Sequence, residues 1–191
     1  MAKRVFFSFH YKDVAEFRAN VVRNHRVVKK GEAEYFDASL WEETKKKGDL
    51  PIKKMINDGI DRTTVTTVLI GSETYARRWV RYEIMKSLQK GNLLLGIHIN
   101  NVANKDQTTK AAGPNPFEYL GYRFSQDGKQ IELYEWDGSK WVIYCDLEAW
   151  KFDEPRSENA RGKFFRLDSR AKVYDWVNDH GYDKFDTWIG E

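Results

Sequence analysis

The sequence predicts an α/β fold: a parallel sheet flanked by helices, followed by a β-meander and a helical tail. The first hundred residues alternate short apolar strands with amphipathic helices, the pattern of a parallel sheet covered on both faces. Val68–Ile70 and Leu93–Leu95 are continuous apolar runs, as expected of strands buried on both sides. Two Asp-Gly pairs in the second half are strong hairpin signals. We expect the parallel strands in the order 2-1-3-4, with later strands extending or flanking the sheet.

The first sixty residues contain two strand–helix pairs. Asp13 with Glu16 resembles a capping box at the start of the first helix. In the second helix Asp49 suits an N-cap and Pro51 lies in the first turn. The expected elements are strand Arg4–Phe9, helix Asp13–Arg23, strand Glu34–Asp37 and helix Asp49–Ile60.

The next forty residues supply two further strands and the longest helix. An apolar stripe runs along one helix face from Ala76 through Val80 and Ile84 to Leu88. A Gly-Asn pair at residues 91–92 marks the end of this helix. The expected elements are strand Val65–Gly71, helix Thr74–Lys90 and strand Leu93–Ile99.

The second half of the chain changes character. Residues 100–116 and 151–163 are polar and are expected to form loops. We expect one domain over residues 1–191, with core βα units in 1–100 and the loop, meander and C-terminal helix in 101–191. The later elements are strands Tyr122–Ser125, Gln130–Trp136 and Lys140–Tyr144, helix Ser169–Asn178, and an aromatic tail Tyr182–Ile189 that packs back on the body.

The composition argues against several classes of function. The net charge of +3, from 32 basic and 29 acidic residues, is too balanced to indicate a nucleic-acid partner. No apolar run is long enough for a signal peptide or a membrane helix, so we expect a cytoplasmic protein without a membrane partner. The single cysteine, Cys145, fits a reducing compartment and is expected to be a small buried packing residue. The four histidines lack metal-ligand spacing, so no metal site is expected.

Polar residues follow several of the expected strands, at the edge where open parallel sheets bind ligands. That edge should hold residues 8–11, 37–41, 71–74 and 98–101. His10 and His98 are therefore candidates for a cleft, with a hydrogen-bonded structural role as the alternative for each. Ser8 has no obvious activating partner and could be an ordinary turn residue. Asp37 could cap a turn or contact a polar ligand.

One carboxylate in the Thr74–Lys90 helix stands out. Glu83 lies one turn after Trp79 on the same side of the helix and borders the apolar stripe. We expect it to face the rim of a cleft, where an acid beside a large aromatic ring suits cleavage of a glycosidic bond. The alternative is a solvated glutamate on a charged helix. Arg77, Arg78 and Arg81 could neutralise a pyrophosphate, although two of the three are expected to be surface or ion-paired residues.

The sequence resembles a known family over nearly its whole length. VFFSFH at residues 5–10 is similar to the strand-one box of TIR domains. RRWVRYE at residues 77–83 is similar to the box in which a Trp precedes the catalytic Glu by four, although the usual Cys after that Trp is Val80 here. The full chain resembles the TIR-like proteins of bacterial Thoeris anti-phage systems, the ThsB family. The resemblance implies a flavodoxin-like TIR fold, with NAD as substrate and no separate cofactor.

The resemblance also implies an activity and its partners. The protein would cleave the nicotinamide–ribose bond of NAD and convert the remainder to a cyclic ADP-ribose isomer. This second messenger would activate a separate effector protein. A phage-derived trigger and self-association belong to the same expectation, so activity would be low until triggered. Residues 100–116 are a candidate lid or assembly surface.

The residue types agree with this chemistry. Ordinary glycosidases stabilise an oxocarbenium-like transition state with two carboxylates. Nicotinamide leaves a pyridinium as a neutral molecule, so no general acid is required and one carboxylate, Glu83, suffices. Phe9 and Trp41 could stack on the substrate and exclude water. The remaining candidate substrate contacts are Ser8, His10, Asp37, Ser39 and Trp79.

Two other functions remain open from the sequence. A non-enzymatic TIR module would signal by assembly with other TIR domains and would release no nicotinamide. An enzyme similar to nucleoside deoxyribosyltransferases would share the sheet and a catalytic Glu, but it would turn over deoxynucleosides and ignore NAD. The TIR-like strand-one box disfavours this last reading.

Overall fold

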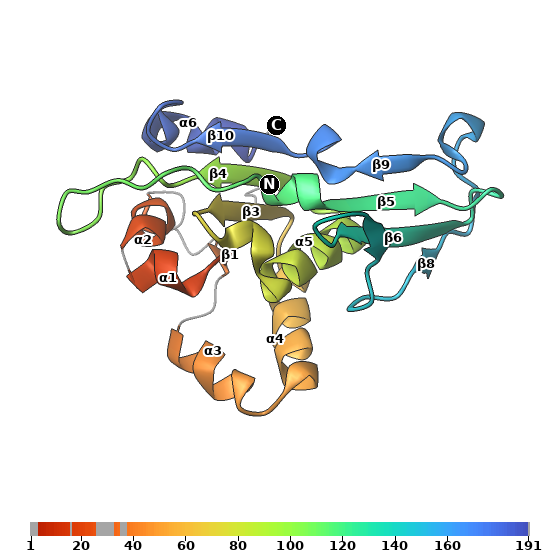
Figure 1. Ribbon diagram of the computed structural model, residues 1–191, viewed down its shortest axis with the longest axis horizontal. Helices are drawn as coiled ribbons and strands as arrows, with labels where there is room; N and C mark the ends of the chain where they lie inside the picture. The colour runs from red at the N-terminus through yellow and green to blue at the C-terminus, as the bar shows by residue number, and fades with distance from the viewer. Residues whose placement is uncertain (1–3, 16, 26–32, 35–37, 191) are drawn as a thin grey trace.

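A parallel sheet forms the centre of the computed structural model, which describes residues 4–15, 17–25, 33–34 and 38–190 (Figure 1). The strands run in the order β10-β4-β3-β1-β2, and every pairing is parallel. The expected order 2-1-3-4 is therefore confirmed, with one further strand added beside β4. These strands are β1 (Val5–Phe9), β2 (Ala33–Glu34), β3 (Val65–Ile70), β4 (Leu93–His98) and β10 (Lys172–Asp175).

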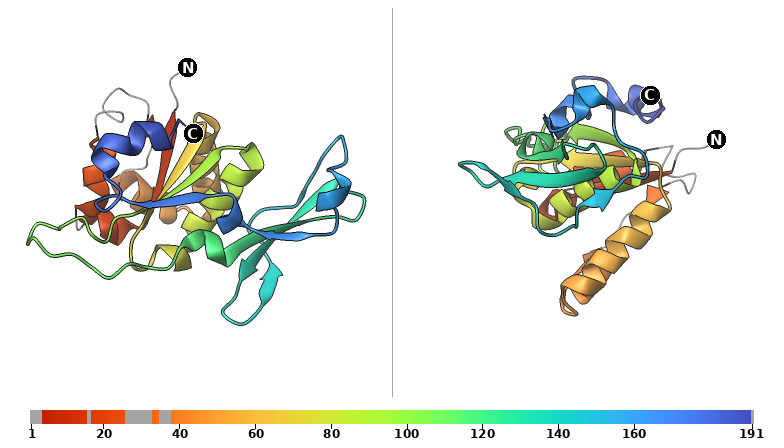
Figure 2. Two further views of the ribbon diagram at one scale, coloured as in Figure 1. Left: turned by 90° about the horizontal axis from the view of Figure 1, so that it is seen from above. Right: turned by 90° about the vertical axis from the view of Figure 1, so that its right-hand side faces the viewer.

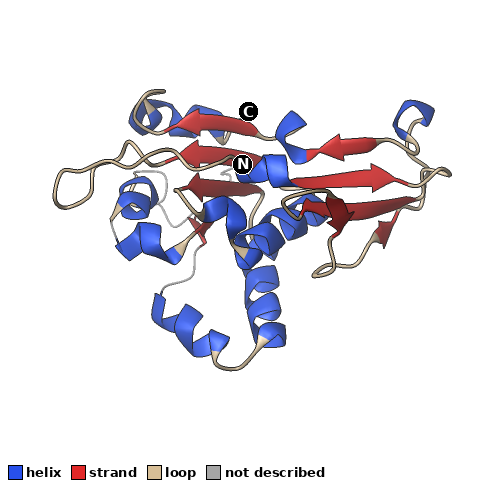
Figure 3. Ribbon diagram, viewed as in Figure 1, coloured by secondary structure: helices blue, strands red, loops and turns tan. Residues whose placement is uncertain are grey.

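Helices lie on both faces of this sheet (Figures 2 and 3). The middle strands are rich in apolar residues because both of their faces are covered, and all six residues of β3 are buried, Thr66 and Thr67 included. Val22 and Phe185 pack on one face, and Ile56 and Ile84 pack on the other. The helices are α1 (Tyr11–Ala15), α2 (Arg18–Arg23), α3 (Ala38–Lys45), α4 (Asp49–Asp61), α5 (Arg78–Lys90) and α6 (Gly181–Trp188).

The expected single helix Asp13–Arg23 is wrong, because the chain breaks between α1 and α2. Phe17 has a φ of 69°, in the left-handed region, which a continuous right-handed helix does not allow. Arg18 follows it and is 1% exposed. Its guanidinium donates to the carbonyl of Thr108, 2.8 Å away, so the break is fixed by the long loop of residues 100–116. Of the expected capping box, Asp13 lies inside α1 and Glu16 lies outside the described residues.

Other elements also differ from the expected ones. The helix expected from Thr74 starts at Arg78, because Thr74–Ala76 form a 3₁₀ turn and Arg77 is extended. Gly48, with a φ of 97°, is the N-cap of α4 in place of Asp49. Helix α3 was not predicted, because its sequence, ASLWEETK, has little apolar periodicity. The strand expected at Glu34–Asp37 meets β2 only at Glu34, since residues 35–37 lie outside the described residues.

The expected meander forms a second, antiparallel sheet that extends beyond the first (Figure 1). Its order is β7-β6-β5-β9, with β8 paired to β6. The two predicted turns are confirmed by Gly128 and Gly138, which have φ values of 72° and 107°. Its inner face shares one apolar cluster with α5, in which Leu133 and Ile84 are buried. The strands are β5 (Leu120–Phe124), β6 (Gln130–Trp136), β7 (Trp141–Ile143), β8 (Trp150–Lys151) and β9 (Phe164–Arg166).

Two expectations for the C-terminal half are wrong and one is confirmed. The helix expected at Ser169–Asn178 does not form, because its middle part, Lys172–Asp175, is strand β10 and pairs with the open edge of β4. Cys145 is exposed rather than buried, since it follows β7 at the surface. The tail does pack back on the body: the ring of Trp188 stacks on Tyr174 with centroids 4.2 Å apart, and Phe185 packs on Phe7. Among the described helices, none is both long and apolar enough to cross a membrane.

Candidate active site

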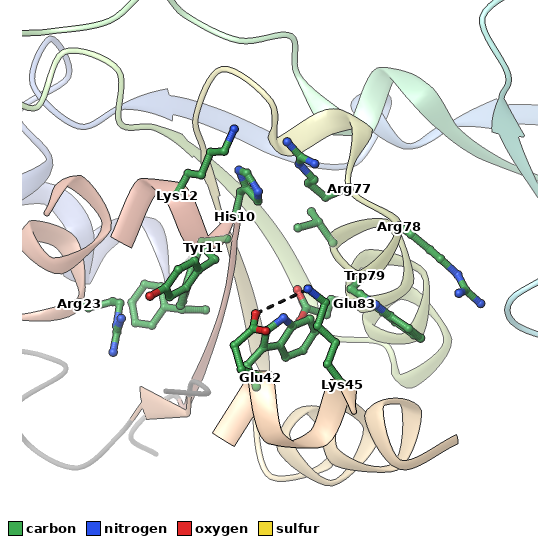
Figure 4. A pocket seen from close by; sticks show the side chains of 14 residues that line it. His10, Tyr11, Lys12, Arg23, Glu42, Lys45, Arg77, Arg78, Trp79 and Glu83 are labelled. Atoms are coloured by element: carbon green, nitrogen blue, oxygen red, sulfur yellow. Dashed lines mark ion pairs between the residues drawn. The ribbon is translucent and has the colours of Figure 1, made fainter. Parts of the chain in front are cut away.

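A cavity of about 420 Å³ opens beside the carboxyl end of β1, between α1, α3 and the first turn of α5 (Figure 4). Its volume is in the range of small-molecule sites. It lies at the edge where open parallel sheets bind ligands, as the sequence predicted. Its apolar and aromatic walls come from Phe7, Phe9, Tyr11, Trp41, Trp79 and Val80.

Glu83 lines this cavity from within the protein rather than from the rim. Its side chain is 6% exposed, so the expectation of a rim position is corrected. The carboxylate is buried because α5 packs across β1, which places Glu83 against the fully buried Ser8. The Ser8 hydroxyl donates to Glu83 Oε2 over 2.5 Å. The sequence showed no partner for Ser8, because the two residues are 75 positions apart.

Burial raises the pKa of Glu83 to about 8, although the hydrogen bond from Ser8 acts in the opposite direction. Because this pKa lies above neutral, the ligand-free protein holds Glu83 mainly in its protonated form at pH 7. A cation that enters the cavity would favour the ionised form. Binding of a cationic ligand should therefore release a proton from Glu83.

The raised pKa predicts how stability depends on pH. The folded protein keeps the Glu83 proton up to about pH 8, whereas the unfolded chain loses it near the ordinary value of 4.5. The free energy of unfolding therefore falls as pH rises from about 4.5 to 8. Glu83→Gln removes this loss, so we expect the variant to melt roughly 5 °C or more above the wild type at pH 8.5. The two melting temperatures should converge at pH 5. The same difference in melting temperature between variant and wild type at pH 5 and at pH 8.5 would contradict a buried, proton-binding Glu83.

Two tryptophans form the aromatic wall beside Glu83. The rings of Trp41 and Trp79 meet edge to face with centroids 6.4 Å apart. The Arg78 guanidinium lies 4.6 Å from the Trp79 ring centroid. Asp146 accepts two hydrogen bonds from Arg78, at 2.7 and 2.6 Å, and Asp49 lies 2.7 Å from the same guanidinium. The meander segment that carries Asp146 thus holds Arg78 over the ring of Trp79.

The predicted arginines are ion-paired, as expected, and the pairing includes all three. Arg78 pairs as described above, Arg81 pairs with Glu135 at 2.6 Å, and Arg77 pairs with Glu73. Arg77 and Arg78 nevertheless line the mouth of the cavity. The basic side chains at this mouth are His10, Lys12, Arg23, Lys45, Arg77 and Arg78. The mouth therefore suits an anionic group, while the interior holds one buried acid.

The histidines at the ligand edge differ in position. His10 lines the cavity, and burial together with Arg77 and Lys12 lowers its pKa to about 4. It is therefore neutral at physiological pH. His98 is half-buried at the end of β4 and is not among the lining residues; burial lowers its pKa, with Asp175 opposing.

The structure brings most of the predicted contact residues together. Phe9, His10, Trp41 and Trp79 line the cavity with Glu83, and Ser8 reaches it through the hydrogen bond described above. Two further candidates are not placed: Asp37 lies outside the described residues, and Ser39 lies in α3, where its side chain is not described. Their proposed contacts with substrate stay predictions.

Sequence reasoning placed Tyr11 at the ligand edge without naming it as a contact, and it missed four further residues at the cavity mouth, namely Lys12, Arg23, Glu42 and Lys45. Glu42 and Lys45 lie in α3, a helix that the sequence pattern did not predict. The signal in the sequence is the four-residue spacing of Trp41 and Lys45, which places both on one helix face. Within the described part of the chain, no cluster of three or more His, Cys, Asp or Glu side chains could hold a metal ion.

The long loop of residues 100–116 contacts the body of the protein at several points, among them α2 and the turn after β3. Arg18 binds Thr108 as described above, and Gly113 packs on the turn after β3. A Cβ atom at Gly113 would lie 2.1 Å from the carbonyl oxygen of Gly71, so this approach requires glycine. The role of this loop as a lid or assembly surface stays a prediction.

Comparison with known proteins gives two matches. The family model described as Thoeris protein ThsB, TIR-like domain, matches residues 6–104. A curated protein of Bacillus cereus (strain MSX-D12), named "Putative cyclic ADP-D-ribose synthase ThsB1", is 58% identical over 191 residues. The alignment covers 99% of this chain and 100% of that protein, so it includes the meander and the tail.

Proposed function

The chain belongs to the ThsB family of TIR-like Thoeris proteins, and we propose that it converts NAD to nicotinamide and a cyclic ADP-ribose-type second messenger. The name of the Bacillus cereus relative describes a synthase of this product class. The single observation that carries the proposal is the buried Glu83 carboxyl group in a cavity with aromatic walls and a cationic mouth. The other acid among the lining residues, Glu42, lies 3.5 Å from Lys45 as an exposed ion pair.

Substrate binding would couple to ionisation of Glu83. The nicotinamide ring of NAD is a pyridinium cation, and Trp41 and Trp79 offer aromatic surfaces for it. The cation stabilises the Glu83 carboxylate, so the proton is lost when the ring enters. The Ser8 hydroxyl then keeps Glu83 Oε2 oriented through its hydrogen bond.

Bond cleavage follows from this arrangement. The bond between the ribose carbon and the nicotinamide nitrogen breaks, and its electron pair neutralises the ring nitrogen. Positive charge moves to the ribose, where the carboxylate of Glu83 stabilises the oxocarbenium ion. The leaving group is neutral, so no acid has to protonate it.

Cyclisation requires a nucleophile from the same dinucleotide and the exclusion of water. A ribose hydroxyl of the retained ADP-ribose attacks the oxocarbenium carbon and gives up its proton, for which Glu83 is a suitable base. Phe7, Phe9 and Val80 make the interior apolar, which disfavours attack by water. The product is then cyclic rather than hydrolysed.

The wider role is proposed from the family. The cyclic product would act in the cytoplasm as a diffusible signal for a separate Thoeris effector protein. A phage-derived trigger and self-association would raise a low basal activity. The mainly protonated state of Glu83 at neutral pH supports low activity in the resting chain.

Nicotinamide release tests this function against its alternatives. Concentrated protein is incubated with NAD or with deoxynucleosides, with and without lysate from infected cells. We expect nicotinamide from NAD, at a rate that rises with the lysate or with protein concentration. Exchange of bases between deoxynucleosides would indicate a deoxyribosyltransferase, and release from neither substrate in any condition would favour the non-enzymatic assembly module.

A further inference from the structure

We propose that Lys12 and Arg77 bind the diphosphate of the dinucleotide, and that Glu73 competes with the substrate for these two cations. The inference rests on the proposed function, because it assigns a part of the same substrate to the mouth of the same cavity. It adds the two cationic residues that bind the diphosphate and the carboxylate that competes for them.

One carboxylate oxygen of Glu73 lies near three basic side chains at this side of the cavity mouth. Glu73 Oε2 lies 3.6 Å from Lys12 Nζ and forms an ion pair with the Arg77 guanidinium. His10 Nδ1 lies 4.0 Å from the same oxygen, but His10 is neutral at physiological pH and adds no charge. A single carboxylate thus serves as counterion for two cations.

The two cations and Glu73 lie in different places relative to the cavity. Lys12 and Arg77 line the cavity, whereas Glu73 is not among the lining residues. Figure 4 shows the charged ends of Lys12 and Arg77 turned away from Glu83. Glu73 therefore holds both cations back from the interior, at a place from which a rotation of their side chains would return them to a ligand.

The ion pairs with Glu73 are of the kind that a ligand can displace. The side chains of Lys12, Arg77 and Glu73 are 67%, 40% and 46% exposed, and exposed ion pairs contribute little to stability. Among the described residues, the buried Nε of Arg77 also has no hydrogen-bond partner. A rotation of the Arg77 side chain away from Glu73 would expose this donor to a phosphate oxygen.

The other cations at the mouth suit this role less well. Arg78 is fixed between Asp146 and Asp49 and stacks on Trp79, so it is committed to the wall. Lys45 lies on α3 beside Glu42, and Arg23 stacks on Phe9 with 5.2 Å to the ring centroid. Lys12 and Arg77, by contrast, share one exposed counterion, Glu73.

The charges decide the direction of the effect. The diphosphate of a dinucleotide carries two negative charges at neutral pH, which matches the two charges of Lys12 and Arg77. In the complex, the diphosphate, Lys12, Arg77 and Glu73 together carry one net negative charge. Without the charge of Glu73 they carry no net charge. Removal of the Glu73 charge should therefore tighten binding of ligands that contain a diphosphate, and only of those.

The test measures binding of NAD and of nicotinamide riboside, which lacks the diphosphate, in a Glu83→Gln background that does not consume NAD. We expect Glu73→Gln to lower the Kd for NAD roughly three- to tenfold, and Lys12→Met or Arg77→Met to raise it by a similar factor. The Kd for nicotinamide riboside should change less than about twofold in each variant. Glu43→Gln is the matched control, because it removes an exposed ion-paired carboxylate of α3 that lies outside the cavity.

The outcomes separate this inference from the proposed function. Unchanged or weaker NAD binding in Glu73→Gln overturns the inference, as does equal tightening of both ligands or the same gain in Glu43→Gln. Nicotinamide release by the protein with native Glu83 is measured separately. Glu73-dependent binding of NAD without any release contradicts the proposed reaction alone, and a failure of NAD to bind even to the protein with native Glu83 contradicts both.

Discussion

Glu83→Gln is expected to abolish nicotinamide release from NAD, with a loss of at least 10²–10³ in rate. The substitution preserves size and hydrogen-bonding capacity but removes the charge that would stabilise the ribose oxocarbenium ion. No other carboxylate among the described cavity residues can replace it, because Glu42 is exposed and paired with Lys45. The measurement is nicotinamide release over time under the condition that gives the highest wild-type rate.

The control must show that the loss of activity is not caused by unfolding. Circular dichroism and thermal melting should show a folded Glu83→Gln protein that is at least as stable as the wild type above pH 8. Glu43→Gln, which makes the same substitution at an exposed carboxylate outside the cavity, should retain wild-type activity. A folded Glu83→Gln protein with a near-normal rate would remove Glu83 from the reaction.

The second large effect is on the pH profile of the wild type. The ratio kcat/KM reports ionisation of the free enzyme, so it should rise with pH through a midpoint near the Glu83 pKa of about 8. Two pH units below the midpoint, the ratio should be about a hundredfold lower than its plateau. The profile is measured from initial rates of nicotinamide release between pH 5.5 and pH 9.5.

Ser8→Ala provides the internal check on that assignment. The Ser8 hydrogen bond lowers the pKa of Glu83, so its removal should move the midpoint to higher pH and reduce kcat/KM at pH 7. The plateau should fall less than the value at pH 7. A flat wild-type profile, or a midpoint that Ser8→Ala leaves unchanged, would show that another group controls the reaction.

The parallel sheet was predictable because the residue pattern of its central strands indicates burial on both faces. Strands such as β3 are buried on both faces, so they carry continuous apolar runs such as Val68–Ile70. The Asp-Gly turns were predictable for a local reason as well, since the left-handed conformation of Gly128 and Gly138 favours glycine.

The errors arose where distant contacts decide the local structure. Residues 172–175 form a strand because β4 offers an open edge, which a pattern of neighbouring residues does not reveal. The break at Phe17 depends on the bond between Arg18 and Thr108, 90 positions away. Helix α3 has too little apolar periodicity to be recognised, although it supplies Trp41 to the cavity.

The candidate site was predictable in its central residue but not in its electrostatics. The spacing of Trp79 and Glu83 and their helix could be read from the sequence. The burial of Glu83 and its bond to Ser8 could not, because they depend on how α5 packs across β1. The same limit applies to Glu73, whose pairing with Lys12 requires the turn after β3 to meet α1.

The identity of the product tests the central claim most directly. NAD is incubated with the wild-type protein and with Glu83→Gln, and the products are identified by mass spectrometry and NMR. We predict that the wild type forms nicotinamide together with an equal amount of a cyclic product, lighter than linear ADP-ribose by one water, and that Glu83→Gln forms neither. Linear ADP-ribose as the main product would contradict cyclisation, and intact NAD in every condition would contradict the enzymatic account.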